Sequence, residues 1–186
     1  RHGSGPVSDA LLRRYMFHQD HNIRFVAANK VLGINSGYIG WRKSGGKLRS
    51  DLMMEFLRSK APRVRRAMFS AIAETMRREK RTKILTREVF DLAVQAVKAP
   101  EESWWIKEAA LHVIGYCPAD WVAPHVDRLL SFLKHKDWWV RNAALTARTQ
   151  VVGDERCDNR GIPAVGELVR TKHRRAPRER RRGRLR

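Results

Sequence analysis

Cysteines and metal-ligand patterns are scarce in this chain. Its 186 residues include two cysteines, Cys117 and Cys157. Two cysteines are too few for a disulfide scaffold or a four-cysteine zinc site. The seven histidines are not spaced like zinc ligands, so we expect no metal and no cofactor.

Long apolar stretches are also missing. Charged residues interrupt every apolar run well before the roughly 18 residues that a membrane-spanning helix needs, so we expect no membrane span. Residues 1–6 lead into no apolar segment of the kind found in a signal peptide, and residue 1 is Arg rather than Met. We expect residues 1–7 to be a flank and the chain to be a fragment of a longer protein.

Acidic residues are outnumbered two to one. The chain has 19 Asp and Glu against 39 Lys and Arg, which gives a net charge of +20 at pH 7. Residues 1–83 carry +13 of this charge, residues 84–153 carry a net zero and residues 154–186 carry +7. Such a surplus attracts nucleic acid or other polyanions. It is equally compatible with a solvated surface, because Lys and Arg are ordinary residues at helix ends.

The motifs of common catalytic sites do not occur. The sequence has no nucleophile elbow, no HExxH, no P-loop and no dinucleotide fingerprint. Most acidic residues fall at expected helix starts, where capping explains them. We therefore expect a non-catalytic chain and assign no catalytic residue.

Self-similarity is the strongest positive signal. Four segments share a β-branched residue, then a basic residue, then small and apolar positions; they begin at Ile23, Val64, Ile106 and Val140, at spacings of 41, 42 and 34 residues. A period near 40 residues fits two helices and two turns. No window alternates like a strand, so the expected fold is all-α with essentially no sheet. The expected helix-pair units are about 8–34, 51–76, 86–116 and 118–153.

The fourth segment carries a family resemblance. Residues 137–145 (DWWVRNAAL) resemble the second-helix signature of HEAT repeats. The resemblance covers roughly residues 8–153 and implies a right-handed α-solenoid of about four HEAT-like antiparallel helix pairs. It also implies a structural role, tying neighbouring repeats together, for the following signature residues: Asp20, Arg24, Arg65, Asp137 and Arg141, with Val140 as the β-branched core residue. The second unit has Ala61 and Pro62 where the Asp is expected, which leaves its tie open.

Two segments interrupt the pattern. Residues 35–50 (NSGYIGWRKSGGKLRS) form an insertion rich in glycine, aromatic and basic residues, and loops of this length are typically functional or disordered. Residues 154–186 contain 11 Arg and one Lys, a composition typical of a disordered tail. The tail is either a native basic arm or non-native sequence from a shifted reading frame.

The candidate binding residues combine aromatic groups, which can stack on bases, with basic groups, which can contact phosphates. They are Tyr38, Trp41, Arg42 and Lys43 in the insertion, and Arg63, Arg65 and Arg66 at a turn between helices. The adjacent pairs Trp104–Trp105 and Trp138–Trp139 are expected to pack mainly between repeats, because large aromatics at helical spacing are usually core.

Three functions stay open at this point. Solenoids offer extended surfaces, so the leading expectation is a scaffold that binds a protein partner or the rest of its parent chain. The alternative is a nucleic-acid-binding α-solenoid that uses the basic N-terminal half. A weaker resemblance, to bacterial alkylpurine DNA glycosylases, would imply an enzyme with Asp120 or Asp137 as the catalytic carboxylate, although both are explained as helix caps.

Overall fold

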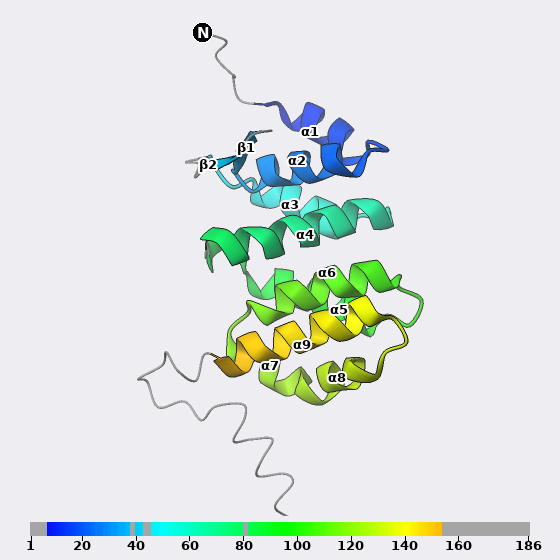
Figure 1. The fold of residues 1–186 in the computed structure, drawn as a ribbon. Coiled ribbons are helices and arrows are strands. Elements are labelled where there is room, and N and C mark those ends of the chain that lie inside the picture. Colours follow the sequence, from blue (N-terminus) through cyan, green and yellow to red (C-terminus); the bar gives the residue numbers. More distant parts are fainter. Residues whose placement is uncertain (1–6, 38–39, 43–45, 80–81, 154–186) are drawn as a thin grey trace, which may run out of the picture.

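The fold is a stack of helices. The computed structural model describes residues 7–37, 40–42, 46–79 and 82–153, with the side chains of 35–37, 40–42, 82 and 148–153 left out. Successive helices follow one another from α1 and α2 at one end of the stack to α7, α8 and α9 at the other (Figure 1). The elements are α1 (Asp9–Met16), α2 (His21–Val31), β1 (Asn35–Gly37), β2 (Gly40–Arg42), α3 (Ser50–Leu57), α4 (Pro62–Glu79), η1 (Thr82–Ile84), α5 (Arg87–Lys98), α6 (Trp104–Gly115), α7 (Ala119–Val122), η2 (Ala123–His125), α8 (Val126–Ser131), η3 (Phe132–Lys134) and α9 (Trp138–Gly153).

Helices pack in pairs, and the pairs pack in order. The second helix of each pair lies beside the first, as α2 beside α1, α4 beside α3, α6 beside α5 and α9 beside α8. The second helices also form a row of their own, in which α2 packs beside α4, α4 beside α6 and α6 beside α9. One continuous apolar core runs through these pairs. The expectation of a helical fold is confirmed.

The first helix of the last pair differs from the expected one. The spacing of apolar residues predicts a single helix from residue 118 to 133, but the structure has α7, η2, α8 and η3 in that span. Pro124 lies inside η2. A proline has no backbone N–H to donate and its ring clashes with the preceding turn, which explains why a continuous α-helix breaks there.

Side chains cap the N-termini of two helices. The Thr86 hydroxyl accepts a hydrogen bond from the backbone N–H of Val89 at 3.3 Å, and the Asp20 carboxylate accepts one from Asn22 at 2.7 Å. Each bond satisfies one of the amide groups that a helix N-terminus leaves without a partner. The caps therefore fix where α5 and α2 begin.

A basic residue in each second helix bonds the turn before that helix. The Nη1 of Arg24 donates to the carbonyls of His18 and Gln19, both at 2.6 Å. Arg141 repeats this six and five residues back, to the carbonyls of His135 and Lys136 at 2.7 and 2.8 Å. Each arginine thus provides a hydrogen-bond donor to two backbone carbonyls of the turn that follows the first helix. Both hold the turn of their own pair.

Histidine completes the turn in the first and last pairs. The Nδ1 of His18 accepts the backbone N–H of Asp20 at 3.0 Å, and His135 accepts that of Asp137 at 3.1 Å. The spacing His-x-Asp-x-x-x-Arg is the same in both places. Two segments more than a hundred residues apart therefore build the same turn from the same side chains.

The second pair reaches a similar turn with different residues. Ser59 stands at the histidine position, and its hydroxyl accepts the backbone N–H of Ala61 at 3.2 Å. Arg65 donates through Nη1 to the Ser59 carbonyl at 2.7 Å and through Nη2 to Glu102 at 2.6 Å. Glu102 lies just before α6, so Arg65 connects one pair to the next. This connection is present although Ala61 stands where the repeat signature has Asp.

The insertion contains a short antiparallel hairpin, β1 with β2, in which Ser36 pairs with Trp41. Strands of three residues are too short for an alternation pattern to predict. The base of the insertion is closed where Gly33 meets Gly46. Gly33 has φ +74, and a Cβ built on it would lie 2.3 Å from the Gly46 carbonyl oxygen, so glycine is required there.

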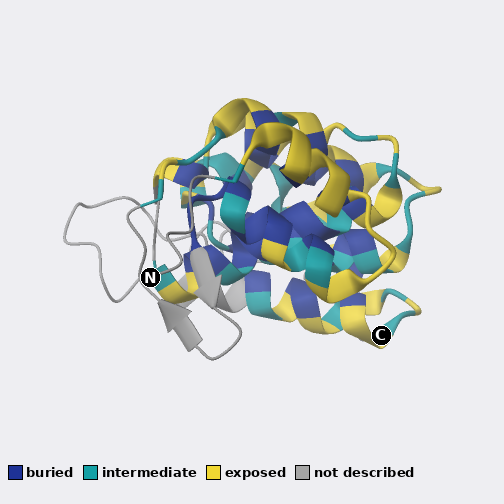
Figure 2. Cartoon of the chain, turned by 90° about the horizontal axis from the view of Figure 1, so that it is seen from above, coloured by how far each residue is buried: buried dark blue, intermediate teal, exposed yellow. Residues whose placement is uncertain are grey.

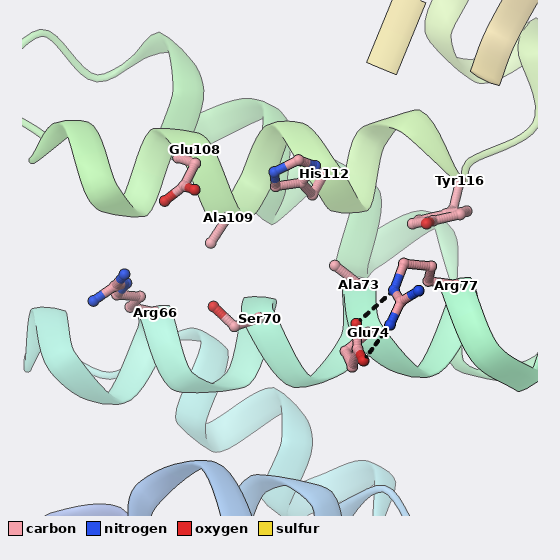
Figure 3. Close-up of a pocket in the computed structure, with 9 residues that line it drawn as sticks. All are labelled: Arg66, Ser70, Ala73, Glu74, Arg77, Glu108, Ala109, His112 and Tyr116. Carbon is pink, nitrogen blue, oxygen red and sulfur yellow. Dashed lines mark hydrogen bonds and ion pairs between the residues drawn. The ribbon is translucent and has the colours of Figure 1, made fainter. Parts of the chain in front are cut away.

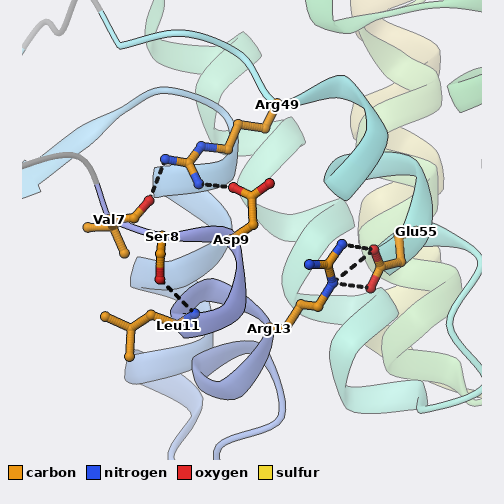
Figure 4. Close-up of polar contacts among 7 residues, drawn as sticks. All are labelled: Val7, Ser8, Asp9, Leu11, Arg13, Arg49 and Glu55. Atoms are coloured by element: carbon orange, nitrogen blue, oxygen red, sulfur yellow. Dashed lines mark hydrogen bonds and ion pairs between the residues drawn. The ribbon is translucent and has the colours of Figure 1, made fainter.

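Arg49 fixes the end of the insertion to the first helix. Its backbone N–H donates to the Val31 carbonyl at 2.9 Å, and its guanidinium donates to the Val7 carbonyl at 2.5 Å and to the Asp9 carboxylate. Figure 4 shows the two guanidinium contacts of Arg49 beside the bidentate pair of Arg13 with Glu55. Residues 154–186, where the Arg-rich tail is expected, lie outside the described residues.

Candidate binding surfaces

The four second helices place equivalent residues on the two sides of the row. We count from the β-branched residue that begins each segment and call the residue three positions later the leading position. The residue five positions later is the trailing position. Because the two positions are two residues apart, their side chains point about 200° apart around the helix. The leading residues are Val26, Ala67, Ala109 and Ala143. The trailing residues are Ala28, Phe69, Leu111 and Leu145.

These positions are buried wherever a neighbouring pair covers them. Ala67, Ala109 and Ala143 at the leading position are buried, as are Ala28, Phe69 and Leu111 at the trailing position. The two exceptions are the first leading residue, Val26, which is 44% exposed, and the last trailing residue, Leu145, which is 48% exposed. The leading side therefore faces the preceding pair and the trailing side faces the following one. The register leaves one apolar residue uncovered at each end.

Further apolar residues extend both ends. Leu11 and Tyr15, one helical turn apart on α1, are exposed. At the other end Trp138 lies seven residues before Leu145, on the same face of α9, and is 55% exposed. We call the surface of Leu11, Tyr15 and Val26 the leading end face, and that of Trp138 and Leu145 the trailing end face. Figure 2 looks down the stack from the α1 end.

The two tryptophan pairs differ from each other, and only the second departs from the expectation. Trp105 is half-buried and packs against the core, whereas Trp104 is exposed. Trp138 and Trp139 are both more than half exposed and meet edge to face, with ring centroids 4.7 Å apart. The expectation of inter-repeat packing is therefore wrong for the last pair, because no following pair covers α9 within the described residues.

A second surface is a groove along the row of second helices. One hollow of 240 Å³ lies between α4 and α6 (Figure 3). Its lining residues are Arg66, Ser70, Ala73, Glu74, Arg77, Glu108, Ala109, His112 and Tyr116. A second hollow of 290 Å³ includes Phe17, Arg24, Arg63 and Trp105 in its lining. The guanidinium of Arg66 lies 5.6 Å from the centroid of the Trp105 ring and so joins the two hollows. We call both together the second-helix groove.

Burial controls the charges on the α6 side of the groove. Burial raises the pKa of Glu108, and the positive charge of Arg66 partly opposes that rise. Burial also lowers the pKa of His112, one turn further along α6. On α4 the pKa of Glu74 is lowered, chiefly by the hydrogen bonds from Arg77 at 2.7 and 2.8 Å. At neutral pH the groove thus holds a neutral imidazole beside several guanidinium groups.

The structure places three of the candidate binding residues. Arg63 is exposed on α4, and Arg66 lies over Trp105 in the groove. Arg65 donates hydrogen bonds to the Ser59 carbonyl and to the Glu102 carboxylate, so its guanidinium is already engaged within the fold. Tyr38 and Lys43 lie outside the described residues, and Trp41 and Arg42 are described only as backbone of β2.

The two candidate catalytic carboxylates lie away from the groove. Asp120 is exposed in the first turn of α7, and Asp137 precedes α9 in the turn described above. The residues that sequence reasoning missed are Glu108 and His112. Their spacing of four on one helix would place them on one face, but only the packing of α4 against that face shows that it is a groove.

The fold defines the chain as a helical protein in which helix pairs stack around an apolar core. Its described residues contain no group of three or more His, Cys, Asp and Glu side chains placed to hold a metal ion. None of its described helices is long and apolar enough to cross a membrane. No protein-family model matches the sequence, and no curated protein matches it.

Proposed function

We propose that the chain is a section of a HEAT-like α-solenoid that acts as a non-catalytic scaffold, and that it docks further helix pairs on its two end faces. The observation that carries this proposal is the exposure of Val26 and Leu145 at positions that are buried in every other pair. The ends of a free-standing helical array need a polar outer surface to remain soluble alone. Here both ends carry large apolar side chains instead.

The two end faces are complementary in register. The trailing residue Leu111 is buried where α9 packs beside α6. By the same register, a further second helix that presents a leading residue to α9 would bury Leu145. Val26 presents such a residue. A second copy of the chain can therefore occupy the trailing end face with its own leading end face, and this makes self-association a direct probe of the docking property.

The experiment is sedimentation velocity of the full chain over a range of concentrations. Salt should be near 0.5 M, because the net charge of +20 otherwise opposes association and salt screens it. We expect the weight-average sedimentation coefficient to rise with concentration. Leu145→Glu and Val26→Glu should each abolish the rise, because each removes one half of a head-to-tail contact.

The matched control is Gln95→Glu, which adds the same charge at an exposed position on α5, away from both end faces. It should associate like the unaltered chain. An unaltered chain that stays monomeric at concentrations on the order of 100 µM, where contacts of even modest affinity show, would overturn the proposal. Association that survives both Glu variants would overturn it as well.

A further inference from the structure

The second hollow of the groove is mostly apolar. It has a volume of 290 Å³ and lies beside the turns of the first two pairs and the start of α6. No Asp or Glu is among the described residues that line it. Its size is near the lower limit of about 300 Å³ for a drug-sized ligand, so it suits one large apolar side chain. Its apolar lining residues are Met16, Phe17, Ala61, Pro62, Val64 and Trp105.

An exposed aromatic ring extends this apolar surface. Phe17 lines the hollow and is 60% exposed, more than any other large apolar side chain of the described residues. Trp105 contributes a second, half-buried ring from α6. Contiguous exposed apolar surface of this kind marks a site of interaction. A side chain bound in the hollow would contact rings from the first and the third pair.

The junction beside the hollow lacks an ion pair that the next junction has. Arg65 of the second pair reaches Glu102 at 2.6 Å. Glu102 stands four residues before the β-branched residue of its segment, and Lys60 has that position in the second pair. Arg24, the counterpart of Arg65, therefore meets no acidic residue there and donates to carbonyls of its own turn. The first junction stays open beside Arg24, which lines the hollow.

Cations with no carboxylate partner stand at the edge of the hollow. Arg63 lines it and is exposed, and Lys60 is exposed next to the lining residue Ala61. Neither cation forms an ion pair with a carboxylate of the described residues. Arg63 is also close enough to Arg24 that its charge, after burial, lowers the pKa of Arg24. Negative charge on both sides of a bound apolar group would be complementary to this edge.

The charge of the chain restricts what can occupy the hollow. Residues 154–186 carry +7 and a second copy of the chain carries +20, so the basic edge would repel both. A nucleic acid has the right charge, but a base would bring polar edge groups into an apolar space, where burial without hydrogen bonds is costly. An acidic polypeptide with an apolar side chain satisfies both requirements.

We propose that this hollow binds an acidic peptide segment of another protein. The peptide would insert one large apolar side chain against Phe17 and Trp105 and place carboxylates beside Arg63 and Lys60. The inserted side chain would supply most of the affinity, as anchors in pockets commonly do, and the carboxylates would select acidic partners. The hollow shares no residue with the two end faces, so it does not depend on the proposed docking of further helix pairs.

The test is the fluorescence anisotropy of labelled peptides titrated with the full chain in about 0.15 M salt, which screens distant charges. The probe is a seven-residue peptide with a central phenylalanine between two runs of three glutamates. One control peptide has alanine in place of phenylalanine, and the other has glutamine in place of every glutamate. We expect the probe to bind about tenfold or more tighter than the alanine peptide, because it buries a large apolar side chain. It should also bind tighter than the glutamine peptide.

Matched variants assign the binding to the hollow. Phe17→Ala should weaken the probe about tenfold and leave the alanine peptide unchanged, whereas Trp139→Ala removes an exposed ring at the other end of the stack and should affect neither. Arg63→Glu should weaken the probe about tenfold. Lys134→Glu, with the same charge change at an exposed position in the last pair, should weaken it less than about threefold. Circular dichroism checks that each variant is folded.

Three results would overturn the proposal. The first is equal affinity for the phenylalanine and alanine peptides, which would reduce the binding to general charge. The second is an affinity for the probe that Phe17→Ala does not change. The third is displacement of the probe by an eight-residue oligothymidylate that itself binds in a Phe17-dependent way, which would assign the hollow to nucleic acid.

Discussion

The junctions between helix pairs and the ends of the stack use the same residue positions with opposite results. Leu111 is fully buried where α9 follows α6, and Leu145 at the equivalent position of α9 is 48% exposed. At the other end Val26 is exposed, whereas Ala67 at the equivalent position of α4 is buried. The difference shows that these leucines and valines are placed by the register of the second helix. Whether they are buried depends on what stacks on them.

The largest expected effect comes from the same substitution made at the two places. Leu111→Ala should lower the free energy of unfolding by about 2–5 kcal/mol, because it leaves a cavity in a packed junction. Leu145→Ala should change it by no more than about 0.5 kcal/mol, as for other surface substitutions. Urea unfolding followed by circular dichroism measures both. Equal losses for the two variants would remove the distinction between junction and end.

The next effect concerns the arginines of the turns. Arg65 bonds its own turn and the next pair, whereas Arg141 bonds only its own turn among the described residues. Arg65→Ala should therefore cost more, about 2–3 kcal/mol against about 1–2 kcal/mol for Arg141→Ala. A double-mutant cycle with Glu102→Gln isolates the contribution between pairs. A coupling of zero would show that Arg65 does not connect the pairs.

The closed base of the insertion provides a local comparison. Gly33→Ala places a side chain at φ +74 and against the Gly46 carbonyl, and should cost about 1–3 kcal/mol through backbone strain. Gln95→Ala at an exposed position on α5 is the control and should change the free energy of unfolding by no more than about 0.5 kcal/mol. Thermal unfolding of the two variants measures the difference, and a Gly33 variant as stable as the control would contradict the geometry.

The smallest effect is a dependence on pH. Burial lowers the pKa of His112 below 6.5 in the folded chain, so the unfolded chain binds a proton more readily. Stability associated with neutral His112 is therefore present above about pH 6.5 and is lost as the pH falls below it. His112→Gln should reduce the loss of stability between pH 7.5 and 5.5. Part of the loss should persist, because the pKa values of His21 and His125 are lowered as well.

Much of the fold could be predicted from the sequence, because the signals are local. The β-branched and basic residues at Ile23, Val64, Ile106 and Val140 recur at helix-pair spacing, and the sequence predicts the cap that Thr86 forms at the start of α5. The break at Pro124 was missed because an apolar pattern alone continues across a proline. Residue spacing could not distinguish an exposed Trp138 from a buried one, since only the presence of a following pair decides this.

The binding surfaces were harder to predict. Arg65 and Arg66 are adjacent and look alike in sequence, but one is bonded to Glu102 and the other lies over Trp105. Partners 37 and 39 residues away set this difference. Sequence charge counts give the total of cations in the basic half. They do not show which of those cations already have a carboxylate.

Crosslinking between copies tests the docking of the end faces most directly. The variant for this experiment combines the substitutions Val26→Cys, Leu145→Cys and Cys157→Ser. A short bismaleimide then crosslinks cysteines of different copies that lie close together. Cys117 should not react, because burial raises its pKa to about 12. The account predicts a ladder of covalent oligomers from this variant, and none from a control in which Gln95→Cys replaces Val26→Cys. No ladder, or equal ladders from both, would contradict it.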